Sequence, residues 1–241
     1  MNLVLDFGNT RLKAALFKEK ECLQTLVFDK PEDLLSSNLL SNPIQQIALA
    51  SVTQDHITLV EELKRTYKVL VFNAETPIPL KNLYQSPATL GSDRILASIG
   101  SYSQFPDKNV LTIDAGTCIK YNFVNSKNEF LGGAISPGIQ MRLKAMHHYT
   151  AALPDLEIEP EFDQLIGDTT RTSMLSGAQI GAIQEVQACI NIYFMQYPTL
   201  QVVLTGGDAG LLSKRLKKPF FANPNSVLTG LNTTLLYQAH H

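Results

Sequence analysis

An internal repeat of a strand, a glycine turn and a second strand constrains the fold most. The run "LVLDFGNTRLKAALF" covers residues 3–17, and "VLTIDAGTCIKYNFV" covers residues 110–124. In both copies an apolar strand ends in an aspartate, a D-x-G turn follows, and a second apolar-rich strand leaves the turn. The repeat predicts two similar lobes, each of which begins with a hairpin.

The segments that follow each copy predict alternating strands and helices. After the first copy we expect strands at 22–28, 47–51 and 68–72, a helix opened by Pro31 and an amphipathic helix at 55–67. After the second we expect a strand at 129–134, helices on either side of a loop, the strand "QVVLTGG" and further helix. This order predicts an α/β protein with mixed sheets. Turn residues in "QFPDKN", 104–109, predict lobes at 1–106 and 107–241.

Composition excludes several classes of protein. The formal net charge is −2 and the basic residues are scattered, which disfavours nucleic-acid binding. No apolar run approaches the ~20 residues that span a bilayer, and no signal peptide is visible at the start, so no membrane partner is expected. Cys22, Cys118 and Cys189 fit neither a disulfide framework nor a zinc site, which favours reduced thiols in a cytoplasmic protein. His240 and His241 are either native or the remainder of a purification tag.

The first hairpin has the residues of a phosphate site. Its turn points consecutive backbone N–H groups into one concavity, and Gly8 allows close approach. Thr10 adds a hydroxyl, and Lys13 can place a charge on a phosphate. Asp6 would repel a bare phosphate but suits a magnesium nucleotide, in which a cation lies between carboxylate and phosphate.

The alternative is that D-x-G-N is only a good tight turn. Two copies, together with a third glycine turn, "LTGGDAG" at 204–210, favour nucleotide binding instead. Neither copy is a Walker loop, because a strand follows the turn and G-x-x-x-x-G-K is absent. Two lobes with a phosphate hairpin each and a glycine pair for adenosine resemble the acetate and sugar kinase, Hsp70 and actin superfamily. That resemblance implies two duplicated ribonuclease-H-like lobes, as in actin-like ATPases, with mixed sheets and an interlobe cleft.

The segment "NLYQSPATLGSDRILASIGSY", 82–102, is the candidate acceptor site. Its second half predicts a helix with Asp93 and Arg94 in the first turn. Asp93 alone is equally compatible with a helix cap. Arg94 is unfavourable there because the helix dipole disfavours a cation, and an anionic ligand would explain it.

Seven motifs in this order resemble the type III pantothenate kinases nearly from end to end. They are "DFGNTRLK", "YQSPATLGSDR", "DAGT", "GGAISPGIQM", "TAALP", "GDTTRTSMLSG" and "LTGGDAGLL". The resemblance implies ATP-dependent phosphorylation of the pantothenate 4′-hydroxyl, the first step toward coenzyme A. It also implies Mg²⁺ with ATP, a monovalent cation (K⁺ or NH₄⁺) and a homodimer with pantothenate near the subunit interface.

The resemblance also implies a role for each motif residue. Asp93 is expected to be the proton acceptor, and Asp114 to bind the monovalent cation. Pantothenate is expected to contact Tyr84, Gly91, Ser92, Asp93, Arg94 and Thr170. ATP is expected to contact Asp6, Phe7, Gly8, Asn9, Thr10, Arg11, Leu12, Lys13 and Thr117, with Asp6 also a possible magnesium ligand through water.

Three residues depart from the family pattern. Ile119 and Asn122 stand where the second phosphate motif usually has threonine and aspartate, and Thr169 stands where asparagine usually precedes the substrate threonine. The first change could alter how the metal of the nucleotide is held, while a hydroxyl at 169 can replace one amide hydrogen bond. Two alternative functions remain on the same fold, namely an actin- or Hsp70-like ATPase and a regulatory accessory protein.

Overall fold

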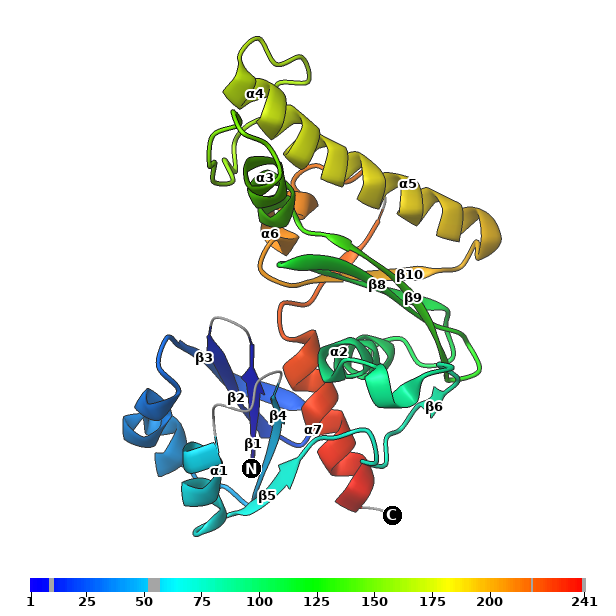
Figure 1. Cartoon of the computed structure of the whole chain (residues 1–241). Helices are drawn as coiled ribbons and strands as arrows, with labels where there is room; N and C mark the ends of the chain where they lie inside the picture. Colours follow the sequence, from blue (N-terminus) through cyan, green and yellow to red (C-terminus); the bar gives the residue numbers. More distant parts are fainter. Residues whose placement is uncertain (9–10, 52–56, 218, 240–241) are drawn as a thin grey trace. The chain divides into compact units, whose positions relative to one another are not determined.

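The computed structural model describes residues 1–8, 11–51, 57–217 and 219–239, with two mixed sheets and their helices (Figure 1). Contacts divide the chain into two compact units. The first contains Met1–Asp107, Val124–Leu131 and Asn225–His241, and the second contains Lys108–Phe123 and Gly132–Pro224. The sequence-based division placed residues 225–241 in the later lobe, whereas the contacts cluster them with the first unit.

The first unit is built on a five-stranded sheet in the order β3-β2-β1-β4-β5. β1 pairs antiparallel with β2 and parallel with β4, so the sheet is mixed. Alternate residues of β1 (Leu3, Leu5 and Phe7) are buried against apolar residues of α1 and of two 3₁₀ helices. The bounds are β1 Asn2–Phe7, β2 Leu12–Lys18, β3 Glu21–Phe28, β4 Gln46–Ser51, β5 Lys68–Val71, α1 Ile57–Lys64, and 3₁₀ helices Pro31–Ser36 and Asn38–Ser41.

Two closely packed helices complete this unit, α2 (Ser92–Tyr102) and α7 (Ser226–Ala239). α7 contacts β1, β2 and β4, and α2 contacts α7 (Figure 1). Glycines permit the close approach, because a Cβ on Gly100 would lie 2.0 Å from the Ser226 carbonyl oxygen and one on Gly230 would lie 1.9 Å from that of Leu96. The helix crossing therefore depends on the absence of two side chains.

The second sheet repeats the strand order of the first. Its order is β11-β10-β7-β8-β9-β6, in which β9-β8-β7-β10-β11 corresponds to β3-β2-β1-β4-β5. The strands are β6 Lys81–Asn82, β7 Val110–Ala115, β8 Cys118–Val124, β9 Glu129–Pro137, β10 Gln201–Thr205 and β11 Phe221–Ala222. β7 and β1 also share one burial pattern, with a partly exposed aspartate at the fifth position. The predicted α/β fold of two similar halves is confirmed.

Helices of the second unit pack on its sheet and on one another. Alternate residues of β7 and β8 share a core with α5, including Ile113, Tyr121 and Val186. A smaller apolar cluster joins α3 to α4. The bounds are α3 Ile139–His148, α4 Thr170–Leu175, α5 Gly181–Gln196 and α6 Ala209–Ser213, with a π-helical turn at Ser176–Ile180 between α4 and α5.

Some elements differ from the predictions. The segment opened by Pro31 forms a 3₁₀ helix, and α1 ends at Lys64, three residues before the predicted end. Residues 55 and 56, the predicted start of α1, lie outside the described residues, as do His240 and His241. Cys22, Cys118 and Cys189 are free thiols.

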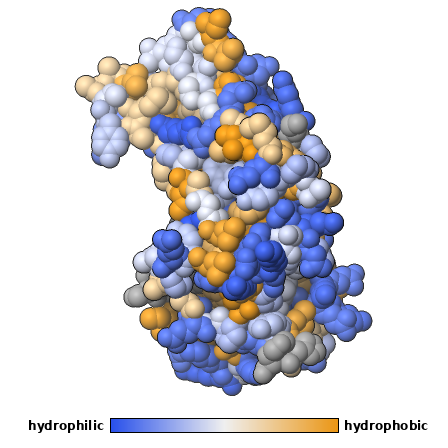
Figure 2. Space-filling view, turned by 90° about the vertical axis from the view of Figure 1, so that its right-hand side faces the viewer, coloured by the Kyte–Doolittle hydropathy of each residue, from blue (hydrophilic) through white to orange (hydrophobic). Residues whose placement is uncertain are grey.

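The surface is hydrophilic with separate apolar patches on the face shown in Figure 2. Within the described ranges, none of the helices combines the length and apolar character that crossing a membrane requires. Exposed apolar residues include Ile192 and Met195 on α5, which are 57% and 76% exposed.

Candidate active site

The first predicted phosphate motif forms the turn between β1 and β2. The Gly8 amide donates to the Arg11 carbonyl oxygen at 3.1 Å, which closes the turn. Asp6, near the end of β1, and Lys13, near the start of β2, lie directly opposite each other in the sheet register. The turn therefore places a carboxylate and an ammonium at the same edge of the sheet. Asn9 and Thr10 lie outside the described residues.

The other predicted ATP residues of this motif differ in accessibility. Phe7 and Leu12 are buried in the core, each 1% exposed, so only their backbone atoms are placed to meet a ligand. The Arg11 side chain is exposed, and its Nε lies 2.8 Å from the Asp29 carboxylate. Arg11 therefore already neutralises a neighbouring acid.

The second predicted phosphate motif lies where three turns of the second unit meet. The Gly138 amide donates to the Thr117 carbonyl oxygen at 3.1 Å, and the Asp208 amide donates to that of Ala115 at 2.9 Å. Gly206 has a φ of +95°, and a Cβ there would lie 2.2 Å from the Ala115 carbonyl oxygen. The β7–β8 turn is thus held by the turns after β9 and β10, and the exposed Thr117 side chain lies at its tip.

Asp114, at the end of β7, forms an ion pair inside its own hairpin. Lys120 of β8 donates to the Asp114 carboxylate at 2.7 Å. Both side chains are largely shielded from solvent, with 14% of Asp114 and 22% of Lys120 exposed. Sequence reasoning missed Lys120, although its place in the second copy of the repeat is close to that of Lys13 in the first.

Asp208 is a second acidic residue at the place where these three turns meet. It precedes α6 and is partly buried, and burial raises the pKa of its carboxyl group above the ordinary value. Sequence reasoning treated this segment only as a glycine turn. The signal that could have identified Asp208 is its position between Gly207 and a short helix.

A polar network supports the turn that contacts Thr117. The Glu185 carboxylate accepts from Ser136 at 2.6 Å and from Tyr121 at 3.0 Å, and it pairs with Arg142. Arg142 also donates through Nε to the Pro137 carbonyl oxygen at 3.0 Å. Although burial opposes ionisation, hydrogen bonds from Ser136, Arg142 and Tyr121 lower the pKa of Glu185. An ionised Glu185 on α5 therefore fixes the two residues that precede Gly138.

The predicted acceptor residues gather at the start of α2. Arg94 is 5% exposed, donates through Nη1 to the Tyr84 hydroxyl at 3.4 Å, and lies 5.3 Å from the centre of the Tyr84 ring. Asp93 accepts a hydrogen bond from the Arg94 amide at 2.9 Å. α2 begins at Ser92, directly after the exposed Gly91. Tyr84 and Arg94 are thus brought together, with Asp93 next to them.

Thr170 begins α4 in the second unit and is exposed. The preceding Thr169 caps this helix, because its side chain accepts from the Thr172 amide at 3.1 Å and the Thr172 side chain completes a capping box. Threonine and asparagine both serve as N-caps, so this departure from the family pattern keeps the cap. At the other departures, Ile119 belongs to the core and Asn122 is fully buried.

The predicted residues belong to two units. Asp6 to Lys13, Tyr84 and the start of α2 lie in the first, while Asp114, Thr117 and Thr170 lie in the second. In the described ranges, no group of three or more histidine, cysteine, aspartate or glutamate residues is arranged to hold a metal ion.

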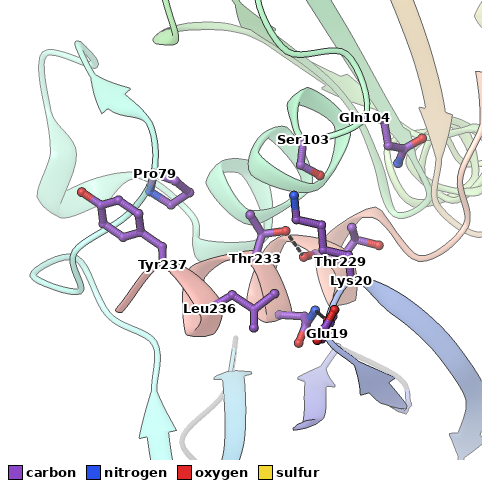
Figure 3. A pocket seen from close by; sticks show the side chains of 10 residues that line it. Glu19, Lys20, Pro79, Ser103, Gln104, Thr229, Thr233, Leu236 and Tyr237 are labelled. Atoms are coloured by element: carbon purple, nitrogen blue, oxygen red, sulfur yellow. Dashed lines mark hydrogen bonds between the residues drawn. The ribbon is translucent and has the colours of Figure 1, made fainter. Parts of the chain in front are cut away.

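The first unit also has a cavity of about 730 Å³ away from these residues (Figure 3). Thr229, Thr233, Leu236 and Tyr237 line it from α7, and Glu19 and Lys20 line it from the β2–β3 turn. This turn is at the opposite end of β2 from the Gly8 turn. None of the predicted site residues lines this cavity.

A family model and curated relatives both identify the same protein family. A family model described as type III pantothenate kinase matches residues 2–191. A type III pantothenate kinase of Christiangramia forsetii is 41% identical over 238 residues, which cover 98% of each chain. Those of Flavobacterium psychrophilum (40% over 244 residues, 99% of this chain and 100% of the relative) and Bacteroides fragilis (39% over 240 residues, 98% of each) are similarly close.

Solved structures show the same fold at low identity. A Baf family transcriptional activator from Campylobacter jejuni matches with a TM-score of 0.61 at 19% identity, over 99% of this chain and all of that one. A ROK hexokinase from Thermus thermophilus matches with a TM-score of 0.53 at 16% identity, over 98% and 99%. These likenesses show the fold alone.

Proposed function

The chain belongs to the type III pantothenate kinases, which phosphorylate pantothenate in coenzyme A biosynthesis, and we propose how its residues divide this work. The near full-length similarity to kinases of this family supports the assignment most directly. ATP and pantothenate are the substrates. The proposal concerns which groups bind each of them and which group receives the proton.

The acceptor site is proposed at the start of α2. The Asp93 carboxylate orients the 4′-hydroxyl of pantothenate and accepts its proton late, as the bond to phosphorus forms, because a carboxylate is a weak base toward an alcohol. Buried Arg94 and Tyr84 contact the pantothenate side, with Gly91, Ser92 and Thr170 completing its site. The Tyr84–Arg94 contact next to Asp93 supports this assignment. A buried cation in the first turn of a helix is also better explained by an anionic ligand.

The ATP site is proposed at the two hairpins. Backbone amides of residues 6–13 and the Lys13 ammonium hold the phosphates, and Thr117 contacts the nucleotide from the second hairpin. A loose phosphoryl-transfer transition state needs placement and charge neutralisation more than covalent help, and these groups supply both. The partly exposed Asp6 carboxylate opposite Lys13 suits Mg²⁺ held through water. Mg²⁺ bound with ATP would neutralise charge on the phosphates.

The resemblance further implies K⁺ or NH₄⁺ at Asp114. The Lys120 ammonium already lies 2.7 Å from that carboxylate, so we assign no step to a separate monovalent ion.

A homodimer in the cytoplasm completes the proposal. Ile192 and Met195, three positions apart on α5, are both exposed, and contact of this helix with a second copy of the chain would cover them. Light scattering on the purified protein would give twice the monomer mass.

The Asp93→Asn variant tests the acceptor assignment. Loss of a general base costs about 10²–10⁴-fold in turnover, while KM for ATP should stay near that of the unaltered enzyme. A coupled assay for ADP, with and without pantothenate, measures both.

Asp33→Asn is the control, because Asp33 lies in a 3₁₀ helix of the same unit. It should keep full turnover. Near-normal turnover of Asp93→Asn would remove Asp93 from its role. Release of ADP that does not depend on pantothenate would indicate an ATPase.

A further inference from the structure

Asp114, whose carboxylate is expected to bind a monovalent cation, already forms an ion pair with a lysine of the same chain. Lys120 Nζ lies 2.7 Å from Asp114 Oδ2, and the two side chains are 22% and 14% exposed. Water therefore screens this ion pair less than it screens an exposed one. The pair belongs to one hairpin, since β7 carries Asp114 and β8 carries Lys120.

The repeat shows that this lysine has an equivalent position in the first hairpin. Ile119, Lys120 and Tyr121 alternate as buried, partly exposed and buried, and the residues from Leu12 to Ala14 do the same. Lys13 lies opposite Asp6 in the register of the first hairpin, as Lys120 pairs with Asp114 in the second. Each hairpin therefore has a lysine across from the aspartate at the fifth position of its first strand, and in the second hairpin the two side chains form an ion pair.

A separate K⁺ or NH₄⁺ does not fit well beside this pair. The added ion would have to share Asp114 with an ammonium of the same charge, in a place where water screens the repulsion weakly. Asp114 also approaches a closed turn, because a Cβ on Gly206 would lie 2.6 Å from its Oδ1. Among the described residues, no group of three or more histidine, cysteine, aspartate or glutamate side chains is arranged around it to hold an ion.

We propose that the Lys120 ammonium takes the place of the monovalent cation at Asp114, so that the kinase works without K⁺ or NH₄⁺. The inference rests on the proposed role of the second hairpin in ATP binding. Lys120 is then a positioning residue: it neutralises Asp114 and holds the hairpin in the form in which Thr117 meets the nucleotide.

The test measures pantothenate-dependent ADP release in potassium chloride and in choline chloride at equal ionic strength. The unaltered enzyme should give the same turnover and KM for ATP in both salts, within about twofold. Lys120→Met removes the ammonium but keeps an apolar stem. In choline its KM for ATP should rise by about tenfold or more, and K⁺ should restore it.

Thermal unfolding supplies a readout independent of activity. K⁺ should raise the Tm of Lys120→Met relative to choline but leave that of the unaltered enzyme unchanged, because only the variant has an uncompensated Asp114. Lys120→Gln serves as a second variant if the methionine does not fold. Lys144→Met is the matched control, because it removes ion pairs of 2.9 and 3.0 Å on α3 of the same unit. It should behave as the unaltered enzyme in both salts.

Different results would overturn the inference about Lys120 and the proposed function on which it rests. An unaltered enzyme that needs K⁺ for turnover overturns the inference, whatever the variants do. A folded Lys120→Met that stays inactive in K⁺ also overturns it, since a free ion then cannot replace the side chain. Full activity of Lys120→Met in choline overturns it too, because Asp114 then needs no cation at all. ADP release that does not depend on pantothenate would instead overturn the proposed function.

Discussion

Asp208 shows how burial and charge oppose each other at a single residue. Burial raises the pKa of its carboxyl group above the ordinary value of 3.8, because it disfavours the ionised form. A raised folded-state pKa contributes stability below the unfolded-state value, and this stability is lost as the pH rises through the folded-state pKa. At neutral pH the ionised Asp208 therefore destabilises the fold.

Replacing Asp208 by asparagine removes this cost. Asp208→Asn should raise the free energy of unfolding at pH 7, and the gain should disappear as the pH falls below about 4. Urea unfolding of both proteins at pH 7 and at pH 3 measures the difference. If Asp208→Asn raised the free energy of unfolding by the same amount at both pH values, the charge of Asp208 would not be the cause of the gain.

Residues whose positions in turns and helix ends follow from local chemistry were predictable from the sequence. The D-x-G turns and the place of Asp93 and Arg94 in the first turn of a helix could be read from a few neighbouring residues. The contact of Arg94 with Tyr84 could not, because it joins residues ten positions apart across an irregular loop. Glu185 was also missed, since its partners Tyr121, Ser136 and Arg142 come from three other elements.

Among the elements, the crossing of α2 and α7 is the contact most sensitive to a small change. A Cβ on Gly230 would lie 1.9 Å from the Leu96 carbonyl oxygen, so neither backbone can accommodate it without moving. Gly230→Ala should therefore reduce the free energy of unfolding by about 1–3 kcal/mol or more. Because α2 carries Asp93 and Arg94, KM for pantothenate should rise as well.

Gly181→Ala is the matched control for this crossing. Nothing lies within 4 Å of a Cβ at Gly181 in α5, and alanine favours a helix over glycine by about 1 kcal/mol. This variant should be as stable as the unaltered protein or more so. Chemical unfolding compares the three proteins, and a neutral Gly230→Ala would show that the helices can separate freely.

The type and order of most elements were predictable because apolar periodicity and turn residues are local signals. Which other element a helix packs against was not predictable. The apolar stripe of α7 shows that one face is buried but cannot indicate which sheet covers it, and the contacts place α7 on β1, β2 and β4. The 3₁₀ form of residues 31–36 was also missed, because Pro31 is equally acceptable at the start of either kind of helix.

For the whole molecule, the proposed binding of a nucleotide to the folded state couples nucleotide binding to stability. Both sheets have the same order of five strands, and the first strand of each corresponding hairpin has an aspartate at its fifth position. A ligand that binds only the folded state stabilises it by about 2.7 kcal/mol at 100 times its Kd. For a chain of this length this corresponds to a rise in Tm of about 5–10 °C.

A magnesium complex of a non-hydrolysable ATP analogue should produce this rise in the unaltered protein. Asp93→Asn should keep it, because the acceptor carboxylate is proposed to act on the alcohol and not on the nucleotide. Lys13→Met should lose most of it, because its ammonium is proposed to neutralise the phosphates. Differential scanning fluorimetry with and without the analogue measures all three. Since the shift reports binding and not turnover, an unchanged shift in Lys13→Met would place the nucleotide away from the first hairpin even if the kinase activity were intact.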